Sequence, residues 1–277
     1  MTAHLDRFAE LVTREQFSLA EACLLIAEDE YPALDVAACI AKLDAMAATV
    51  RGRLAEDAFP EQKVAALNFH LFNELRFCGN TDAYYDPRNS YLNEVLERRT
   101  GIPITLSIVY LEVGRRLGLR LQGVSFPGHF LVKLRLKKGE LVLDPFTGGE
   151  PRSESDLRSR LEQALAPERP RELDLDRFLA PATPRDIVAR VLRNLKGIYT
   201  KDGKLEQALA VMQRLLLVLP ESAEELRDRG LIYAQLECFR PAVADLQSYL
   251  RRSPEAADGS DIHAKVVELR DAASRLQ

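Results

Sequence analysis

The fold is decided by Gly101-Ile102-Pro103-Ile104-Thr105-Leu106-Ser107, followed later by Gly128-His129-Phe130 and Leu143-Asp144-Pro145. Proline suits the first turn of a helix, so position 103 predicts a helix start, and Gly118 marks its end. The hydrophobic period then changes, and short β-type runs at 121–126, 130–136 and 140–143 predict strands, with a hairpin turn at 137–139. Such a hairpin brings His129, placed at the start of a strand, close to Asp144 on one face of the sheet.

This order of residues resembles the transglutaminase-like division of the papain-like cysteine hydrolases. Enzymes of that division place a cysteine at the N-terminus of the helix, about fifteen residues before the Leu-Gly that ends it. Counting back from Gly118 by that spacing reaches Pro103. The wider match, from 68 to 149, resembles the SirB-type bacterial family, which itself has Pro where the enzymes have Cys. The resemblance implies a triad remnant, His129 and Asp144, without its nucleophile.

Two other residues are candidates for the missing nucleophile. Cys78 follows the end of a helix rather than beginning one, so no helix dipole would lower its pKa, and a plain buried thiol is the simpler interpretation. Ser107 shares a helix face with Pro103, but a serine inside a helix usually bonds the carbonyl four residues earlier. Without a nucleophile, His129 and Asp144 are better interpreted as a structural pair.

The region from 68 to 93 has an unusual composition. Five of the six asparagines of the chain lie there, among several aromatic residues. Asparagine favours caps and turns because its side chain bonds nearby backbone, so we expect a structured, partly buried loop. Asn89 is a candidate N-cap for a helix from 91 to 99. We predict that the loop 80–89, with Tyr84, Tyr85 and Asn89, forms one wall of a cleft that contains His129.

The two ends of the chain favour helices. Residues 1 to about 77 are predicted to be helical, with Pro60 beginning a helix that runs towards Phe77. Four prolines between 167 and 184 indicate a linker, with a short extended piece at 173–178. Beyond it, one pattern of a tyrosine, an alanine and a proline occurs twice with the same spacing, first as Tyr199, Ala208 and Pro220 and then as Tyr233, Ala242 and Pro254. This repetition resembles tetratricopeptide repeats. A final amphipathic helix is expected at 262–276.

The overall composition narrows the class of protein. The 38 basic and 42 acidic residues nearly cancel, and this balance argues against a nucleic-acid surface. No apolar run approaches the ~20 residues that span a bilayer, and no signal-peptide core precedes the first helix. The four cysteines form no CxxC pair, so neither a zinc site nor a disulfide framework is indicated. We expect a cytoplasmic protein without metal or cofactor.

Together these patterns predict an α+β fold. Residues 1–166 would form N-terminal helices and a transglutaminase-like, papain-like core of helix plus antiparallel sheet, and 167–187 a linker. Residues 188–277 would form all-α tetratricopeptide-like repeats. The expected function is a non-catalytic interaction or scaffold module that binds a protein or peptide through a degenerate cleft and the repeats. The alternative is an amidohydrolase or peptidase with an altered nucleophile. The sequence identifies neither the partner nor the oligomeric state.

Overall fold

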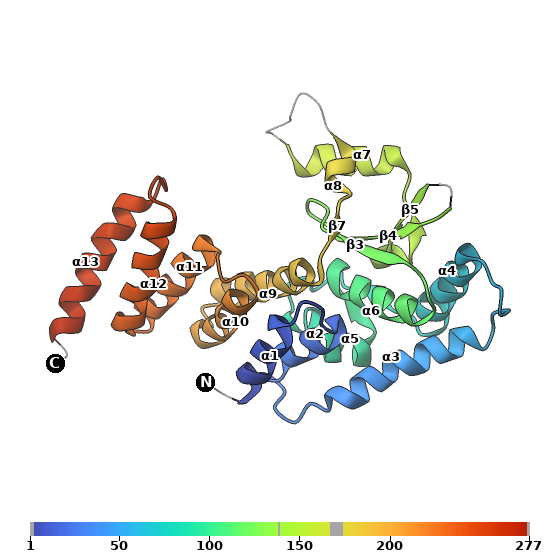
Figure 1. Cartoon of the computed structure of the whole chain (residues 1–277), viewed down its shortest axis with the longest axis horizontal. Helices are drawn as coiled ribbons and strands as arrows, with labels where there is room; N and C mark the ends of the chain where they lie inside the picture. Colours follow the sequence, from blue (N-terminus) through green and yellow to red (C-terminus); the bar gives the residue numbers. More distant parts are fainter. Residues whose placement is uncertain (1–2, 138, 167–173, 276–277) are drawn as a thin grey trace. The chain divides into compact units, whose positions relative to one another are not determined.

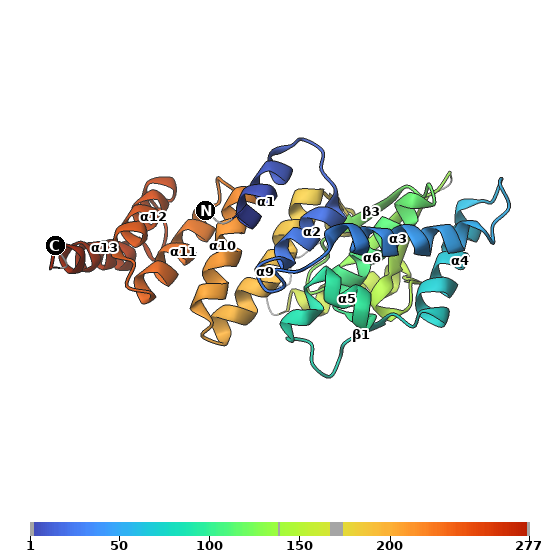
Figure 2. The ribbon, with the colours of Figure 1, turned by 90° about the horizontal axis from the view of Figure 1, so that it is seen from below.

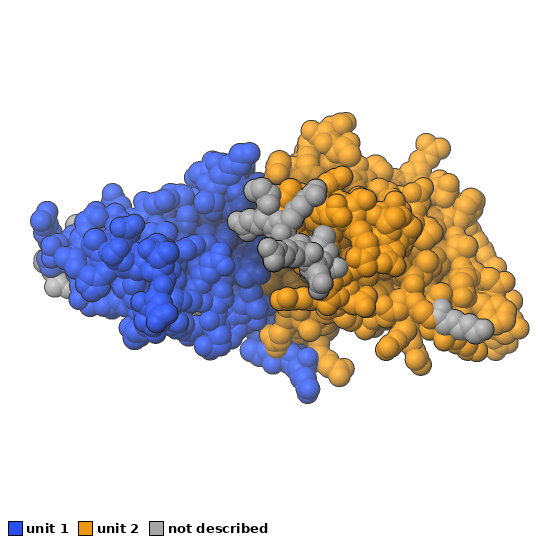
Figure 3. All heavy atoms as spheres, turned by 90° about the horizontal axis from the view of Figure 1, so that it is seen from above, with its two compact units in different colours: residues 1–15, 192–277 blue, residues 16–191 orange. Residues whose placement is uncertain are grey.

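The computed structural model describes residues 3–137, 139–166 and 174–275 (Figure 1). The chain divides into two compact units, coloured separately in Figure 3: residues 1–15 with 192–277, called unit 1, and residues 16–191, called unit 2. The predicted α+β fold class is confirmed, with an antiparallel sheet between N-terminal helices and C-terminal helical repeats. Residues 1–15 group with the repeats in unit 1, and the predicted segment boundaries stay a prediction.

Unit 2 is built around a buried central helix. Its helices are α2 (Leu19–Ala27), α3 (Val36–Arg51), α4 (Pro60–Asn68), α5 (Leu92–Arg98), α6 (Pro103–Arg116), α7 (Glu154–Ala164) and α8 (Leu175–Phe178). Helix α6 begins at Pro103 and ends before Gly118, whose φ of +75° reverses the chain at little cost for a glycine. Every residue from Pro103 to Gly114 is buried, because α2, α3 and α5 cover one side of α6 and the sheet covers the other (Figures 1 and 2).

The sheet of unit 2 is antiparallel throughout. Its strands are β3 (Leu121–Val124), β4 (Leu131–Arg135), β5 (Glu140–Asp144), β6 (Glu150–Pro151) and β7 (Pro181–Ala182), in the order β6-β5-β4-β3-β7. Strands β4 and β5 form the predicted hairpin, with Val132 opposite Leu143. A separate parallel pair joins β1 (Cys78–Gly79) to β2 (Thr100–Gly101). The sheet therefore presents the end of β5, with Asp144, towards the residues that precede β4.

Of three local predictions, two were wrong. The helix predicted to run from Pro60 towards Phe77 is confirmed as α4 followed directly by a π-helix over residues 69–74, and the amide of Asn68, at the junction, donates to the carbonyl of Gly149 at 2.9 Å. Asn89 is not the N-cap of α5; Tyr91 holds that position, and the Asn89 amide bonds loop carbonyls instead. The expected extended piece is the short helix α8, capped by Asp174, and residue 173 lies outside the described residues.

Unit 1 is helical. It contains α1 (Ala3–Thr13), α10 (Leu205–Val218), α11 (Ala223–Gln235), α12 (Phe239–Arg252), α13 (Gly259–Arg275) and most of α9 (Pro184–Lys201). Each of α10, α11 and α12 packs against the helix that follows it, and α1 packs against α10. Ala208 and Ala242 are fully buried, as expected of the small residues in a repeat. Among the described residues, no helix combines the length and apolar character that crossing a membrane requires.

Two helix glycines in these repeats are expected to respond oppositely to substitution. A Cβ at Gly230 would lie 2.8 Å from the Leu246 side chain, whereas a Cβ at Gly197 would meet nothing within 4 Å. We expect Gly230→Val to destabilise the protein by about 1–3 kcal/mol through overpacking between α11 and α12. Gly197→Ala should instead stabilise it by about 0.5–1 kcal/mol, since alanine loses less backbone entropy in a helix. Circular dichroism during urea unfolding measures both changes, and equal effects at the two sites would contradict the packing assigned to Gly230.

Candidate functional site

The His129–Asp144 pair lies at the end of the β4–β5 hairpin. His129 Nε2 is 2.9 Å from Asp144 Oδ1, so the predicted proximity of the two side chains is confirmed. His129 is 8% exposed and Asp144 is completely buried. One detail differs from the prediction, because His129 lies in the turn that precedes β4 and not in the strand itself. If Nε2 carries the proton that Asp144 accepts, Nδ1 is left with its lone pair for another partner.

The two oxygens of the buried Asp144 carboxylate differ, because Oδ1 accepts hydrogen bonds while Oδ2 has only ion-pair contacts within the described residues. Oδ1 also accepts the backbone N–H of Phe146 at 3.2 Å, and Oδ2 lies 3.4 Å from an Arg152 nitrogen and 3.6 Å from an Arg160 nitrogen. Burial raises the pKa of Asp144, but the hydrogen bond from His129 and the nearby charges outweigh it, so the pKa is lowered overall. Asp144 is therefore an ionised carboxylate that orients His129.

The ring of Phe146 connects this pair to the strand that contains Cys78. The rings of His129 and Phe146 are edge-on, with centroids 5.9 Å apart. A Cβ at Gly79 would lie only 2.4 Å from the Phe146 ring, so this close approach requires a glycine next to Cys78. Cys78 itself is exposed, and its Sγ lies 3.7 Å from Thr100 Oγ1. The buried thiol that the sequence favoured is thus wrong for Cys78.

Pro103 stands at the first position of α6 and is buried. Helix α6 packs against β4 and against the 3-10 turn Pro145–Thr147, which directly follows Asp144. Thr105 fixes this helix end, because its Oγ1 accepts the N–H of Ile102 and donates to the carbonyl of Asn89 at 2.7 Å. A proline at this position supplies neither a nucleophilic atom nor a backbone N–H.

Ser107 lies one turn further along α6 and is fully buried. We expected its hydroxyl to bond the carbonyl of Pro103, but that prediction is wrong: within the described residues, Ser107 Oγ has no hydrogen-bond partner. A buried hydroxyl without a partner costs free energy, about 1–3 kcal/mol from mutational data. Ser107 is therefore the nucleophile-type side chain of α6 whose hydroxyl remains free to bond something else.

The loop 80–89 is folded around two asparagine amides. Asn89 is completely buried, and its Oδ1 accepts from Asn80 at 3.1 Å. Tyr84 and Tyr85 are 38% and 68% exposed, with edge-on rings 5.3 Å apart between centroids. Burial raises the pKa of Tyr84, and the nearby charge of Arg190 opposes this rise. Arg190 also donates to the backbone carbonyl of His129 at 3.5 Å. The Arg190 side chain therefore lies near both Tyr84 of the loop and His129 of the site.

Several side chains around the pair were not found from the sequence. Arg152, Arg160 and Phe146 follow Asp144 without a recognisable motif, and their role depends on how β6 and α7 fold back. Asn68 was noticed only for its composition, yet it bonds both Gly149 and Tyr110 and so ties α4 and α6 to the turn after Asp144. Among the residues that the structure describes, no cluster of His, Cys, Asp or Glu could hold a metal ion.

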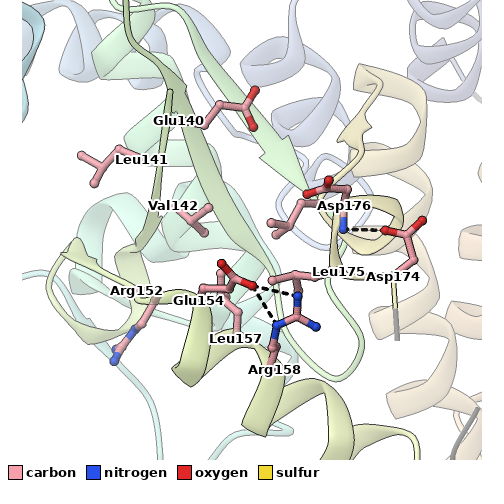
Figure 4. Close-up of a pocket in the computed structure, with 11 residues that line it drawn as sticks. Glu140, Leu141, Val142, Arg152, Glu154, Leu157, Arg158, Asp174, Leu175 and Asp176 are labelled. Carbon is pink, nitrogen blue, oxygen red and sulfur yellow. Dashed lines mark hydrogen bonds and ion pairs between the residues drawn. The ribbon is translucent and has the colours of Figure 1, made fainter. Parts of the chain in front are cut away.

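A cavity of about 460 Å³ lies between β5 and the helices α7 and α8 (Figure 4). Its floor is apolar, with Val142, Leu157 and Leu175, and its rim carries charges of both signs. Figure 4 shows Arg158 turned to Glu154, and the two form an ion pair of 2.7 Å. Neither His129 nor Asp144 lines this cavity, but Arg152, which pairs with Asp144, does, so the cavity adjoins the candidate site.

Known protein families match both the sheet-containing part and the helical-repeat part of the chain. The family model of the transglutaminase-like superfamily matches residues 37–193, and that of the tetratricopeptide repeat matches residues 195–266. A UPF0162 protein of Xylella fastidiosa is 43% identical over 93% of this chain and 92% of its own length. A UPF0162 protein of Pseudomonas aeruginosa is 31% identical over 96% of each chain, and Protein SirB1 of Salmonella typhimurium is 32% identical over 74% of each.

Proposed function

We propose that this chain, which belongs to the transglutaminase-like superfamily and shares its bacterial family with the UPF0162 and SirB1 proteins, is a non-catalytic protein-interaction module. The observation that carries the proposal is Pro103, which occupies the first position of α6 while the His129–Asp144 pair is intact. The enzymes that this fold resembles need a thiol at that position.

Two chemical losses at Pro103 support a non-catalytic role. Acyl transfer by a cysteine enzyme needs a thiolate, which the positive end of a helix and a neighbouring imidazole stabilise. It also needs N–H groups that bind the developing oxyanion, and removing one such donor typically costs a factor of ~10²–10³ in rate. Pro103 removes both the thiol and an N–H. In this proposal Asp144 only orients the His129 ring in a binding cleft, and the pair activates no nucleophile.

The tetratricopeptide repeats supply the second interaction surface in this proposal. Repeat helices of this kind generally bind protein partners, and stacked hairpins form extended surfaces. Ion pairs that include a buried carboxylate stiffen them here. Glu225 is completely buried and accepts from Arg193 at 2.8 Å and from Lys196 at 2.6 Å, while Lys196 also reaches Asp228 at 2.7 Å. These pairs connect α9 with α11 within unit 1.

Turnover measurements test the non-catalytic part. We expect the wild-type protein to release no product from peptide, ester or glutamine-amide substrates above the level given by the His129→Ala variant. Ser107→Ala and Cys78→Ser serve as further controls, since each removes one side chain that could replace the missing thiol. Wild-type turnover that disappears in His129→Ala would contradict the proposal.

The second candidate is an enzyme of altered mechanism, an amidohydrolase or peptidase. The observation that favours it is the unpartnered hydroxyl of Ser107 within the described residues, because a free, buried hydroxyl is unusual unless something else binds it. In this alternative, Ser107, the exposed Cys78 or a water molecule would act with His129. Turnover lost in Ser107→Ala but kept in Cys78→Ser would select the serine version, and the reverse result would select the thiol.

A further inference from the structure

A basic cavity of about 420 Å³ lies at the end of unit 2 where α4 begins. It is lined by the start of α4, by residues 118–120 between α6 and β3, and by residues 134–137 at the end of β4 and just after it. Figure 1 shows where these elements lie. Its charged lining residues are Lys63, Arg120, Arg135 and Lys137. No acidic side chain of the described residues lines it, although the whole chain has a formal net charge of −4.

Three of these four cations are available to a ligand. Lys63 is already used, because its Nζ donates to the carbonyl of Leu117 at 3.1 Å and so closes the end of α6. Arg120, Arg135 and Lys137 are exposed, and within the described part of the chain their side chains have neither an ion pair nor a hydrogen bond. The neighbouring cation Lys133 differs, since it pairs with Glu140 at 2.9 Å.

The inner surface of the cavity is apolar. Leu119 and Leu134 are buried, and Leu136 is half-buried and faces the same space. Free cations around an apolar floor fit a ligand that has both negative charge and an apolar group, because each part then meets its complement. A cavity of this volume accommodates a few side chains.

The beginning of α4 argues against a site for bare phosphate. Phosphate sites at helix starts use free backbone N–H groups. Here Pro60 has no N–H at the first position, and the N–H of Phe59 is bonded to Gln62 at 2.9 Å. With these two positions unable to donate, recognition would come mainly from separate side-chain charges and the apolar surface of the leucines, which suits an extended peptide better than a compact anion.

We propose that this cavity binds an acidic segment of a partner protein. An apolar side chain of that segment lies on Leu119, Leu134 and Leu136, and flanking carboxylates pair with Arg120, Arg135 and Lys137. The surface is separate from the His129–Asp144 pair and from the repeats, so it goes beyond the proposed function and can be tested independently of it.

Peptide selection on the full-length protein tests this site. A phage-displayed library of random short peptides is selected on the wild type and on a variant with Arg120→Gln, Arg135→Gln and Lys137→Gln. A matched control removes three exposed cations that lie outside the cavity, by Arg177→Gln, Arg240→Gln and Arg270→Gln. We expect the wild type and the control to enrich acidic peptides with a central apolar residue, and the cavity variant to lose them.

Affinity measurements then separate the contribution of the three cations from that of the apolar leucine surface. By fluorescence anisotropy, a labelled selected peptide should bind the cavity variant about tenfold more weakly, since each rim charge contributes modestly. Its affinity for the wild type should fall as NaCl rises, because salt screens exposed charges. Leu136→Ser should weaken binding severalfold while the salt dependence stays the same. Three results would overturn the proposal. The selection could fail to enrich acidic peptides, or the cavity variant could bind the peptide as tightly as the wild type does. Pyrophosphate or oligothymidylate could also displace the labelled peptide as effectively as the unlabelled peptide does.

Discussion

Asp144→Ala is expected to lower the free energy of unfolding by about 3 kcal/mol. Removing one partner of a buried ion pair typically costs 3–5 kcal/mol, because the other charge is left uncompensated. Here His129 would lose its acceptor, and the guanidinium groups of Arg152 and Arg160 would lose their shared carboxylate. The lower end of the range applies because the side chains of these arginines are 22% and 38% exposed, so water can partly solvate them.

Glu150→Ala provides the matched control on the adjacent strand β6. The Glu150 side chain is 69% exposed and lies 4.0 Å from Arg152, so it belongs to the same charge cluster without being buried. We expect its removal to change stability by less than about 1 kcal/mol. Urea unfolding followed by circular dichroism suits this chain, which has no tryptophan. Similar losses of unfolding free energy in Asp144→Ala and Glu150→Ala would show that the burial of Asp144 adds nothing to its contribution to stability.

The lowered pKa of Asp144 also has a consequence for acid stability. A carboxyl group whose pKa is lower in the folded state binds fewer protons there, so it stabilises the fold above the pKa of the unfolded chain, about 3.9. That stabilisation is lost as the pH falls through the folded-state pKa. Unfolding free energies measured from pH 6 downwards should therefore decrease less steeply below about pH 4 in Asp144→Asn than in the wild type.

The hydrogen-bonded pair His129–Asp144 could be predicted because the pairing of two neighbouring strands in one hairpin brings the two residues together. Strand period and turn position fix which residues of β4 and β5 are opposite, so the sequence places His129 near Asp144 without knowledge of the remaining chain. The start of α6 was equally local, since proline fixes its own backbone angle at the first helical position.

Asn89 and Ser107 could not be predicted from local preference. Asn89 has the residue type of an N-cap, but the carbonyls of the folded loop take its amide first. Ser107 could bond its own helix, yet its hydroxyl has no partner within the described residues, and nothing in the spacing of α6 indicates this. Arg152 and Arg160 reach Asp144 only through the path of β6 and α7. The three-dimensional path of the loop, of β6 and of α7 sets the surroundings of Asn89, Arg152 and Arg160, and the spacing of residue types in the sequence does not encode that path.

Pro103→Cys is expected to create a thiol whose pKa lies below that of an ordinary cysteine. The new side chain would stand at the start of α6, where the helix dipole favours a thiolate, and we expect the free Nδ1 of His129 to face it. The structural cost should be small, about 0.4–1 kcal/mol, because proline here mainly restricts the unfolded chain. Alkylation rate measured against pH reports the thiol pKa, in a background with Cys78→Ser and Cys238→Ser, since these two cysteines are exposed.

Pro60→Cys separates the helix from the imidazole. Pro60 holds the same first position in α4, so a cysteine there gains a helix N-terminus without the His129–Asp144 pair. Because position 103 is buried and position 60 is exposed, the thiol pKa values read from the pH profiles are compared, not the rates. We expect the pKa of the thiol at 103 to lie about one unit or more below that of the thiol at 60, and to rise when His129→Ala is added. Equal pKa values at the two positions would mean that His129 does not reach the start of α6. The cleft would then lack the geometry of a cysteine hydrolase as well as its nucleophile, because the imidazole could neither take a proton from that position nor stabilise a charge there.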